Sequence, residues 1–124
     1  MSTSFQLQNN TLKELPHNIE AEQGILGAIL LNNEIFFDIS ETINVEHFYE
    51  PVHKLIFDVI GKMVSKGQIA TPITLKSFFE VEKNLEEIGG SNYLVRLANS
   101  AVSLDYAKNY AHIIYNLAVR RGLY

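Results

Sequence analysis

Residues 51–66 read PVHKLIFDVIGKMVSK, and this stretch decides the fold class because its apolar residues recur with the period of an α-helix. Pro51 suits the first position of a helix, where its missing N–H leaves no hydrogen bond unmade. Lys62 and Lys66 lie near the other end and complement the helix dipole. The apolar positions fall at i, i+3, i+4, i+7, i+8 and i+11 and are Val52, Leu55, Ile56, Val59, Ile60 and Met63. The stretch predicts an amphipathic helix that ends at Gly67.

A second long helix is predicted upstream, beginning after Asn18 and ending near residue 31. The Asn18 side chain can accept a free backbone N–H of the first turn, as an N-cap does. The apolar stripe of this helix is wide enough for a largely buried helix and includes Ile19, Ala21, Ile25, Leu26, Ala28, Ile29 and Leu30. Gly24 and Gly27 interrupt the stripe, and each costs a helix about 1 kcal/mol relative to alanine. We therefore expect another helix to approach closely at these glycines.

Two shorter helices are predicted where polar or glycine residues interrupt the apolar pattern. Asn32 and Asn33 suit a helix stop followed at once by a new N-cap. The helix after them carries the apolar residues Phe36, Ile39 and Ile43. Gly89 and Gly90 predict a turn, after which Ser91 is expected to cap a further helix. Its apolar stripe consists of Leu94, Leu97, Ala98 and Ala101.

Another helix is predicted between the amphipathic helix and that glycine turn. Pro72 separates the two helices, because it favours an extended conformation for Thr71. Thr74 is expected to cap the new helix, with Ile73 and Phe78 packing across the cap as a hydrophobic staple. The core side of this helix is predicted to be Leu75, Phe78 and Phe79.

The last helix is predicted to begin at Ser103 or Asp105 and to keep helical spacing over about twenty residues, with no glycine or proline before Gly122. No segment alternates with the period 2 of a strand. We therefore predict an all-α fold, with a disordered leader at 1–14, a compact multi-helix bundle at 15–102 and a separate C-terminal helix at 103–124.

Composition excludes several classes of protein. The chain has 124 residues, enough for one domain, and a formal net charge of −4, which disfavours a dedicated DNA-binding module. Cysteine is absent, so disulfides, thiolate metal sites and cysteine nucleophiles are excluded. No apolar run approaches the roughly 18 residues of a membrane span, and the first fifteen residues lack the features of a secretory signal. We expect a cytoplasmic protein with no membrane contact.

No catalytic, cofactor-binding or metal-binding residues can be assigned from the sequence. Gly61 and Lys62 lack the rest of a phosphate-binding loop, so no cofactor is expected for this chain. The four histidines do not share one helical face and are expected to be surface or partly buried residues with ordinary hydrogen bonds; they are His17, His47, His53 and His112. The carboxylate pairs diverge on a helix and are predicted to be solvated; they are Glu20/Glu22, Glu80/Glu82 and Glu86/Glu87. Six phenylalanines lie within apolar stretches and are predicted to pack in the core; they are Phe36, Phe37, Phe48, Phe57, Phe78 and Phe79.

The last helix has more than one side to bury. Its apolar stripe is accompanied by Ala107, Ala111 and Ala118 on neighbouring faces. We expect that the chain is truncated and that this helix pairs with a missing segment or with another subunit. The residues proposed for that contact are Tyr106, Tyr110, Ile113, Ile114 and Leu117. Ordinary packing of the same residues against the bundle is the competing interpretation.

Several segments resemble one protein family in order and approximate spacing. They begin with LPHNIEAEQ at 15–23 and ILGAILL at 25–31. The later segments are Phe48-Tyr49 with His53, Ile56-Phe57, Ile73-Thr74-Leu75, Gly89-Gly90 with Tyr93-Leu94, and Tyr110-Ala111 with Ile113-Ile114. Over residues 15–124 the chain resembles the amino-terminal domain of the bacterial replicative DNA helicases, the DnaB family.

The resemblance implies a helical bundle followed by a helical hairpin, of which residues 103–124 would be the first arm. It also implies an assembly and primase-docking role in DNA unwinding at the replication fork, with no catalysis in this fragment. The implied partners are other copies of the chain, as a dimer or partial collar here and a hexamer in the full-length parent, together with primase and a possible helicase loader. ATP, Mg²⁺ and most DNA contacts would belong to the parent's motor domain. The alternative is a stand-alone helical adaptor or regulatory protein without that motor.

Overall fold

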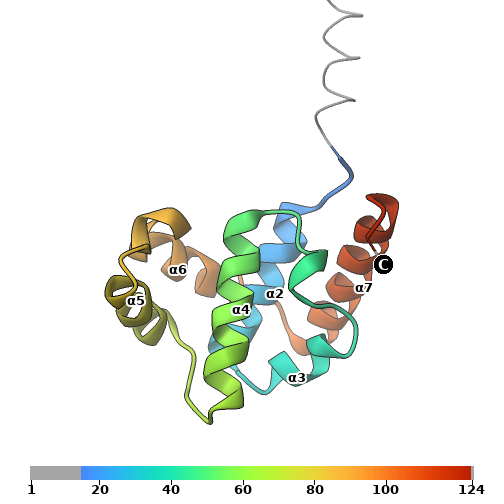
Figure 1. Cartoon of the computed structure of the whole chain (residues 1–124). Helices are drawn as coiled ribbons and strands as arrows, with labels where there is room; N and C mark the ends of the chain where they lie inside the picture. The colour runs from blue at the N-terminus through green and yellow to red at the C-terminus, as the bar shows by residue number, and fades with distance from the viewer. Residues whose placement is uncertain (1–14, 124) are drawn as a thin grey trace, which may run out of the picture.

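A computed structural model describes residues 15–123, and the predicted leader at 1–14 lies outside the described residues. These residues form α-helices and 3₁₀-helices and no strand, as the sequence predicted (Figure 1). In chain order they are α2 (Ile19–Leu31), α3 (Ile35–Ser40), η1 (Val45–His47), α4 (Pro51–Ser65), α5 (Pro72–Val81), η2 (Leu85–Ile88), α6 (Gly90–Asn99) and α7 (Leu104–Arg120). Among them no helix is both long and apolar enough to cross a membrane.

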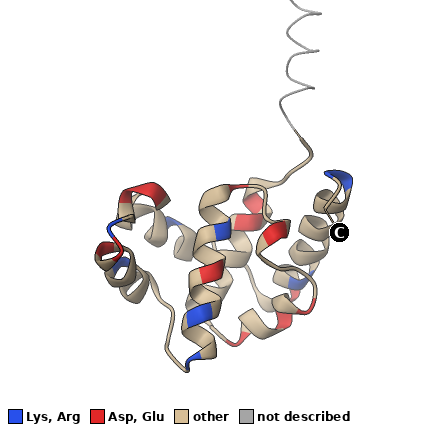
Figure 2. Cartoon of the chain, viewed as in Figure 1, with Lys and Arg blue, Asp and Glu red and all other residues tan. Residues whose placement is uncertain are grey.

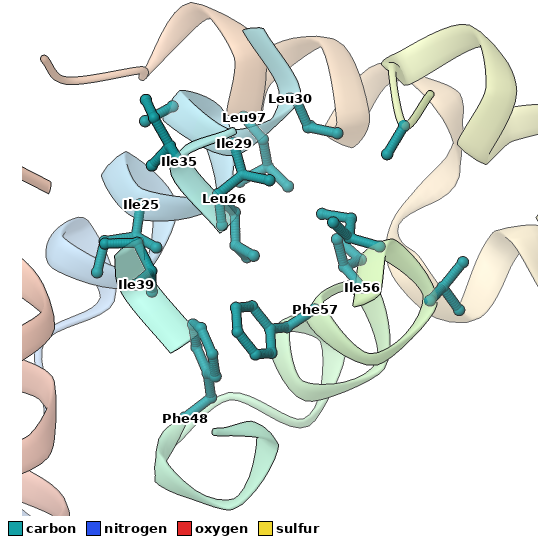
Figure 3. Close-up of a cluster of buried hydrophobic side chains, with 14 of the residues drawn as sticks. Ile25, Leu26, Ile29, Leu30, Ile35, Ile39, Phe48, Ile56, Phe57 and Leu97 are labelled. Carbon is teal, nitrogen blue, oxygen red and sulfur yellow. The ribbon is translucent and has the colours of Figure 1, made fainter. Parts of the chain in front are cut away.

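Helix α2 lies at the centre of the fold, and α3, α4, α6 and α7 all pack against it (Figure 1). Every position from Ala21 to Leu30 except Gln23 is buried. A helix that is apolar all round must be enclosed by its neighbours. Figure 3 shows the α2 side chains, Leu26 among them, converging with Ile56 and Phe57 of α4 and with Phe48.

Other elements approach α2 closely at its two glycines, as the sequence predicted. A Cβ on Gly27 would overlap the carbonyl oxygen of Leu97 in α6 and would lie 2.9 Å from the backbone nitrogen of Ala101. A Cβ on Gly24 would lie 3.2 Å from side-chain atoms of Val102 and Tyr110. Only a residue without a side chain therefore fits at Gly27, because the atoms that face it are backbone.

The ends of the long helices follow the sequence prediction. The Asn18 side chain accepts a hydrogen bond from the Ala21 backbone N–H at 2.9 Å and caps α2. Pro51 occupies the first turn of α4, and Gly67 just beyond the helix has the left-handed φ of +76° that favours glycine. Ser103 is the N-cap position of α7.

Five local predictions about the shorter helices were wrong, and the first four concern α5, α6 and the end of α3. Thr71, not Thr74, caps α5: the two threonines form a reciprocal capping box, with Pro72 in the first turn. Ile73 therefore lies inside the helix and is exposed, so no staple forms with Phe78. The other two corrections concern Ser91, which lies within α6 after the left-handed N-cap residue Gly89, and Ile43, which is buried but lies beyond the end of α3.

Asn33 does not cap α3, contrary to prediction, because its side chain joins two distant parts of the chain. The amide group donates to the carbonyl oxygens of Ile29 and Ala70 at 2.7 and 2.9 Å, and its oxygen accepts from the Ala70 N–H at 2.7 Å. This bridge fixes the end of α2 against the loop before α5. Phe37 also departs from prediction, since its side chain is exposed, whereas Phe48, Phe57 and Phe79 are buried.

Gly27→Ala is expected to lower the free energy of unfolding by about 2–3 kcal/mol, because the added methyl group forces α6 away from α2. Gly24→Ala is the matched control: its methyl group meets side chains that can move, so we expect a change within about 1 kcal/mol. Urea unfolding followed by circular dichroism measures both variants. Equal stabilities for the two variants would contradict the close approach at Gly27.

Candidate protein interface

Helix α7 has one buried side and one exposed side. Its alanines and Ile114 face α2, and the buried set is Ala107, Ala111, Ile114 and Ala118. Small residues allow the two helix backbones to come close, which explains the alanine spacing noted in the sequence. The side of α7 away from α2 carries apolar residues that remain in contact with solvent.

The five residues predicted to form an interface do not share one environment. Tyr106 and Ile113 are exposed, at 60% and 39% of their maximum area. Tyr110 and Leu117 are partly buried. Ile114 is only 2% exposed and belongs to the core, so its assignment to the interface was wrong. The prediction failed there because helical spacing groups Ile113 and Ile114 together, whereas the packing against α2 separates them.

A hollow of about 290 Å³ lies beside the exposed side of α7. Its walls come from the start of α2, from the connection between α6 and α7, and from α7 itself. The lining residues are Asn18, Glu20, Ala21, Gln23, Ser100, Val102, Tyr110 and Ile113. Two of the predicted interface residues, Tyr110 and Ile113, thus form the wall of a concave surface, whose apolar and polar lining suits contact with another protein.

The structure also contains a buried polar network that the sequence analysis missed. Glu22 is 1% exposed, contrary to the prediction of a solvated carboxylate. Its carboxylate accepts hydrogen bonds from the backbone N–H groups of Tyr49 at 2.7 Å and Glu50 at 3.3 Å. A third bond, 2.7 Å long, joins Glu22 Oε1 to His53 Nδ1. Both carboxylate oxygens thus have hydrogen-bond partners, as a buried charge requires.

His53 continues the network towards α6. His53 and His47 are buried, so the expectation of surface or partly buried histidines was wrong for both. The Nε2 atom of His53 lies 2.5 Å from the hydroxyl oxygen of Tyr93, which also accepts from the Gln23 amide at 3.1 Å. With the His53 proton on Nδ1, Nε2 accepts from the Tyr93 hydroxyl and every group has a partner. Burial raises the pKa of Tyr93 above its usual value of 10, so the hydroxyl remains a donor.

The network connects three helices through hydrogen bonds between their buried side chains. Glu22 comes from α2, His53 from α4 and Tyr93 from α6. Because the carboxylate and both ring nitrogens have protein partners, the network positions these three helices relative to one another. No group of three or more metal-ligating side chains occurs among residues 15–123. A sequence signal did exist: Glu22 and His53 lie on the apolar stripes of their helices.

Arg121 fastens the end of α7 to the start of the bundle. Its guanidinium donates to the carbonyl oxygens of Pro16 at 2.7 Å and His47 at 2.8 Å. It also lies 5.4 Å from the centroid of the Tyr49 ring, on which the His17 ring stacks at 4.0 Å. These contacts, which we call the Arg121 clasp, hold the C-terminal end of α7. In the N-terminal half of the helix, Tyr110 packs against Gly24.

His47 lies beside this clasp in a position that disfavours its charged form. Burial lowers the pKa of His47 below its ordinary value of 6.5, the positive charge of Arg121 lowers it further, and Glu46 partly opposes them. The ring accepts a hydrogen bond at Nδ1 from the Asn44 backbone N–H at 3.0 Å. Protonation of Nδ1 would break that bond.

The chain is similar in sequence to known proteins. Residues 14–116 match the family model described as DnaB-like helicase N terminal domain. The replicative DNA helicase DnaB of Rickettsia felis is 45% identical over 109 residues, which cover 88% of this chain and 22% of that protein. The corresponding helicase of Buchnera aphidicola is 36% identical over 96 residues, 77% of this chain and 21% of that protein. The chain thus spans about a fifth of the length of these curated relatives.

A solved structure shows the same fold. The crystal structure of the N-terminal domain of DnaB helicase from Mycobacterium tuberculosis superimposes with a TM-score of 0.82 at 30% sequence identity. The match covers 87% of this chain and 78% of that chain. The agreement therefore extends over most of both molecules.

Glu22→Gln is expected to lower the free energy of unfolding by about 1–3 kcal/mol. The amide places a donor where the carboxylate accepts from Tyr49, Glu50 and His53, so at least one buried donor loses its partner. Glu20→Gln, on the exposed side of α2, is the control and should change stability by no more than about 0.5 kcal/mol. Chemical unfolding measures the difference, and equal effects at the two positions would show that the network does not hold the helices.

His47→Gln is expected to flatten the dependence of stability on pH. Because the His47 pKa is lower in the folded than in the unfolded protein, its contribution is complete above pH 6.5 and falls as the pH decreases towards the folded-state value. The stability advantage of the wild type over the variant should therefore shrink between about pH 7.5 and 5.5. Unfolding free energies measured across that range would contradict the assignment if the difference stayed constant.

Proposed function

This chain belongs to the DnaB-like helicase N-terminal domain family, and on that premise we propose that it is an assembly and primase-docking domain of a replicative DNA helicase. Such a domain acts in DNA unwinding at the replication fork and in the primosome. Its work needs shaped surfaces, not catalytic groups. The ATP, Mg²⁺ and most of the DNA contacts belong to the motor domain of the parent helicase.

The observation that carries the assembly role is the two-sided packing of α7. One side of the helix is held on α2 by small residues, and the other presents Tyr106 and Ile113 to solvent. Aromatic and branched apolar residues beside a hollow are typical of protein interfaces. The Arg121 clasp supports the same role, because it holds the helix in one position before a partner arrives.

The partners follow from the proposed role. Other copies of the chain meet through α7, as a dimer or partial collar for this chain and as a hexamer for the full-length parent. Residues 103–124 serve as the first arm of a helical hairpin, and primase docks on the assembled collar. A helicase loader is a further candidate partner, and the cytoplasm is the place where these partners meet.

The charge distribution supports protein contact over direct DNA binding. Basic residues are spread over separate helices and interleave with acidic residues (Figure 2). The formal net charge of the chain is −4. A protein that binds the DNA backbone through its own surface concentrates positive charge on one face.

The double variant Tyr106→Ser with Ile113→Ser is expected to weaken self-association about tenfold or more and to leave the fold intact, because both side chains are exposed. His112→Ser, on the other exposed flank of α7, is the matched control and should associate like the wild type. Sedimentation equilibrium measures association, and circular dichroism checks folding. A folded double variant that associates as tightly as the wild type would overturn the assembly role of this face.

A further inference from the structure

The outward face of α5 carries the two most exposed large apolar side chains of the described residues. Ile73 is 78% exposed and Val81 is 76% exposed. They lie four residues on either side of Ser77, which is also exposed, so the three residues form one stripe along the helix. The opposite face of α5 is occupied by the buried residues Leu75 and Phe79. The stripe therefore has no partner within residues 15–123.

A groove runs beside this stripe. It has a volume of about 690 Å³ and lies between the end of α4 and α5. Its apolar walls are Met63, Ile69, Phe78 and Val81. Ile73 does not line the groove, but it precedes Thr74, which does. The face thus combines an exposed apolar side chain with an apolar groove. A patch with both features can fit a second copy of itself across a two-fold axis.

The charges of α5 match the same two-fold arrangement. Lys76 and Glu80 flank the stripe on one side, both are exposed, and neither has an ion-pair partner among the described residues. If two α5 helices pack antiparallel with Ser77 near the axis, Ile73 of one copy lies at the height of Val81 of the other. Lys76 of each copy then comes within reach of Glu80 of the other copy. One arrangement thus pairs both the apolar and the charged residues.

We propose that the outward face of α5 is a two-fold docking surface for a second copy of this chain. The small serine at the centre allows the two helices to approach, the groove receives Ile73 of the other copy, and two Lys76–Glu80 pairs fix the antiparallel direction. The contact is separate from the proposed α7 interface, since α5 and α7 lie on opposite sides of the molecule (Figure 1). A two-fold contact joins only two copies, so larger closed assemblies need two such faces.

Charge reversal provides the test, because it changes the pairing between copies in a way that can be restored by mixing. Lys76→Glu places a second carboxylate opposite Glu80 of the other copy, and Glu80→Lys places two ammonium groups opposite each other. Each variant alone should self-associate about tenfold more weakly than the wild type. An equimolar mixture of the two variants restores opposite charges across the axis and should associate like the wild type. Sedimentation equilibrium at protein concentrations up to about 1 mM measures the association of the single variants and of the mixture. The high concentration is needed because a contact through one helix face is small and therefore weak.

Two controls separate this proposal from the role of α7. The Tyr106→Ser/Ile113→Ser background isolates the α5 contact, and thermal unfolding confirms that the charge variants remain folded. Rescue on mixing in that background supports the α5 surface even if the α7 interface has failed its own test. Absence of rescue, or a background protein that stays monomeric at about 1 mM, overturns the α5 proposal and leaves the α7 interface untouched.

Discussion

The contact at Gly27 is the constraint on which the arrangement of this domain depends. Because glycine has no side chain, the Leu97 carbonyl and the Ala101 backbone can lie directly against α2. This contact places α6 and the connection into α7, while the remaining sides of α2 are covered by α3, α4 and α7. A helix buried on every side sets the position of each neighbour, so the outer surfaces of the domain are fixed relative to one another.

The polar network favours one arrangement of the apolar packing over others. Apolar contacts fill space with little preference for one register, whereas Glu22 is satisfied only when Tyr49, Glu50 and His53 all occupy their places. Leaving a buried charge without donors is strongly unfavourable, so alternative arrangements of α4 around α2 are disfavoured. The Arg121 clasp extends the same principle to the end of α7. Rigid faces of this kind lower the entropy lost when a partner binds.

Sequence reasoning predicted the helices and the reason for Gly27, because periodicity and glycine placement are local signals. It failed where the outcome depends on which residues meet across the fold. Glu22 and His53 have no local pattern that pairs them, since 31 positions separate them in the chain. Thr71 and Thr74 are both good caps, and the reciprocal bond between them decided in favour of Thr71. Ile113 and Ile114 were separable only once the position of α2 was known. The spare apolar side of the last helix suggested a contact with another subunit, and the family resemblance suggested the proposed assembly role.

Native-state hydrogen exchange of the backbone amides tests most directly the claim that α2 is the central, enclosed helix on which the packing of the domain depends. If α2 is enclosed and held by its neighbours, its central amides, from Ile25 to Leu30, exchange only through global unfolding. Their exchange free energies should then equal the free energy of unfolding measured by urea and exceed those of the exposed turns of α5 and α7. Exchange of the α2 amides through local opening, at a lower free energy than those of α4 or α7, would contradict the account.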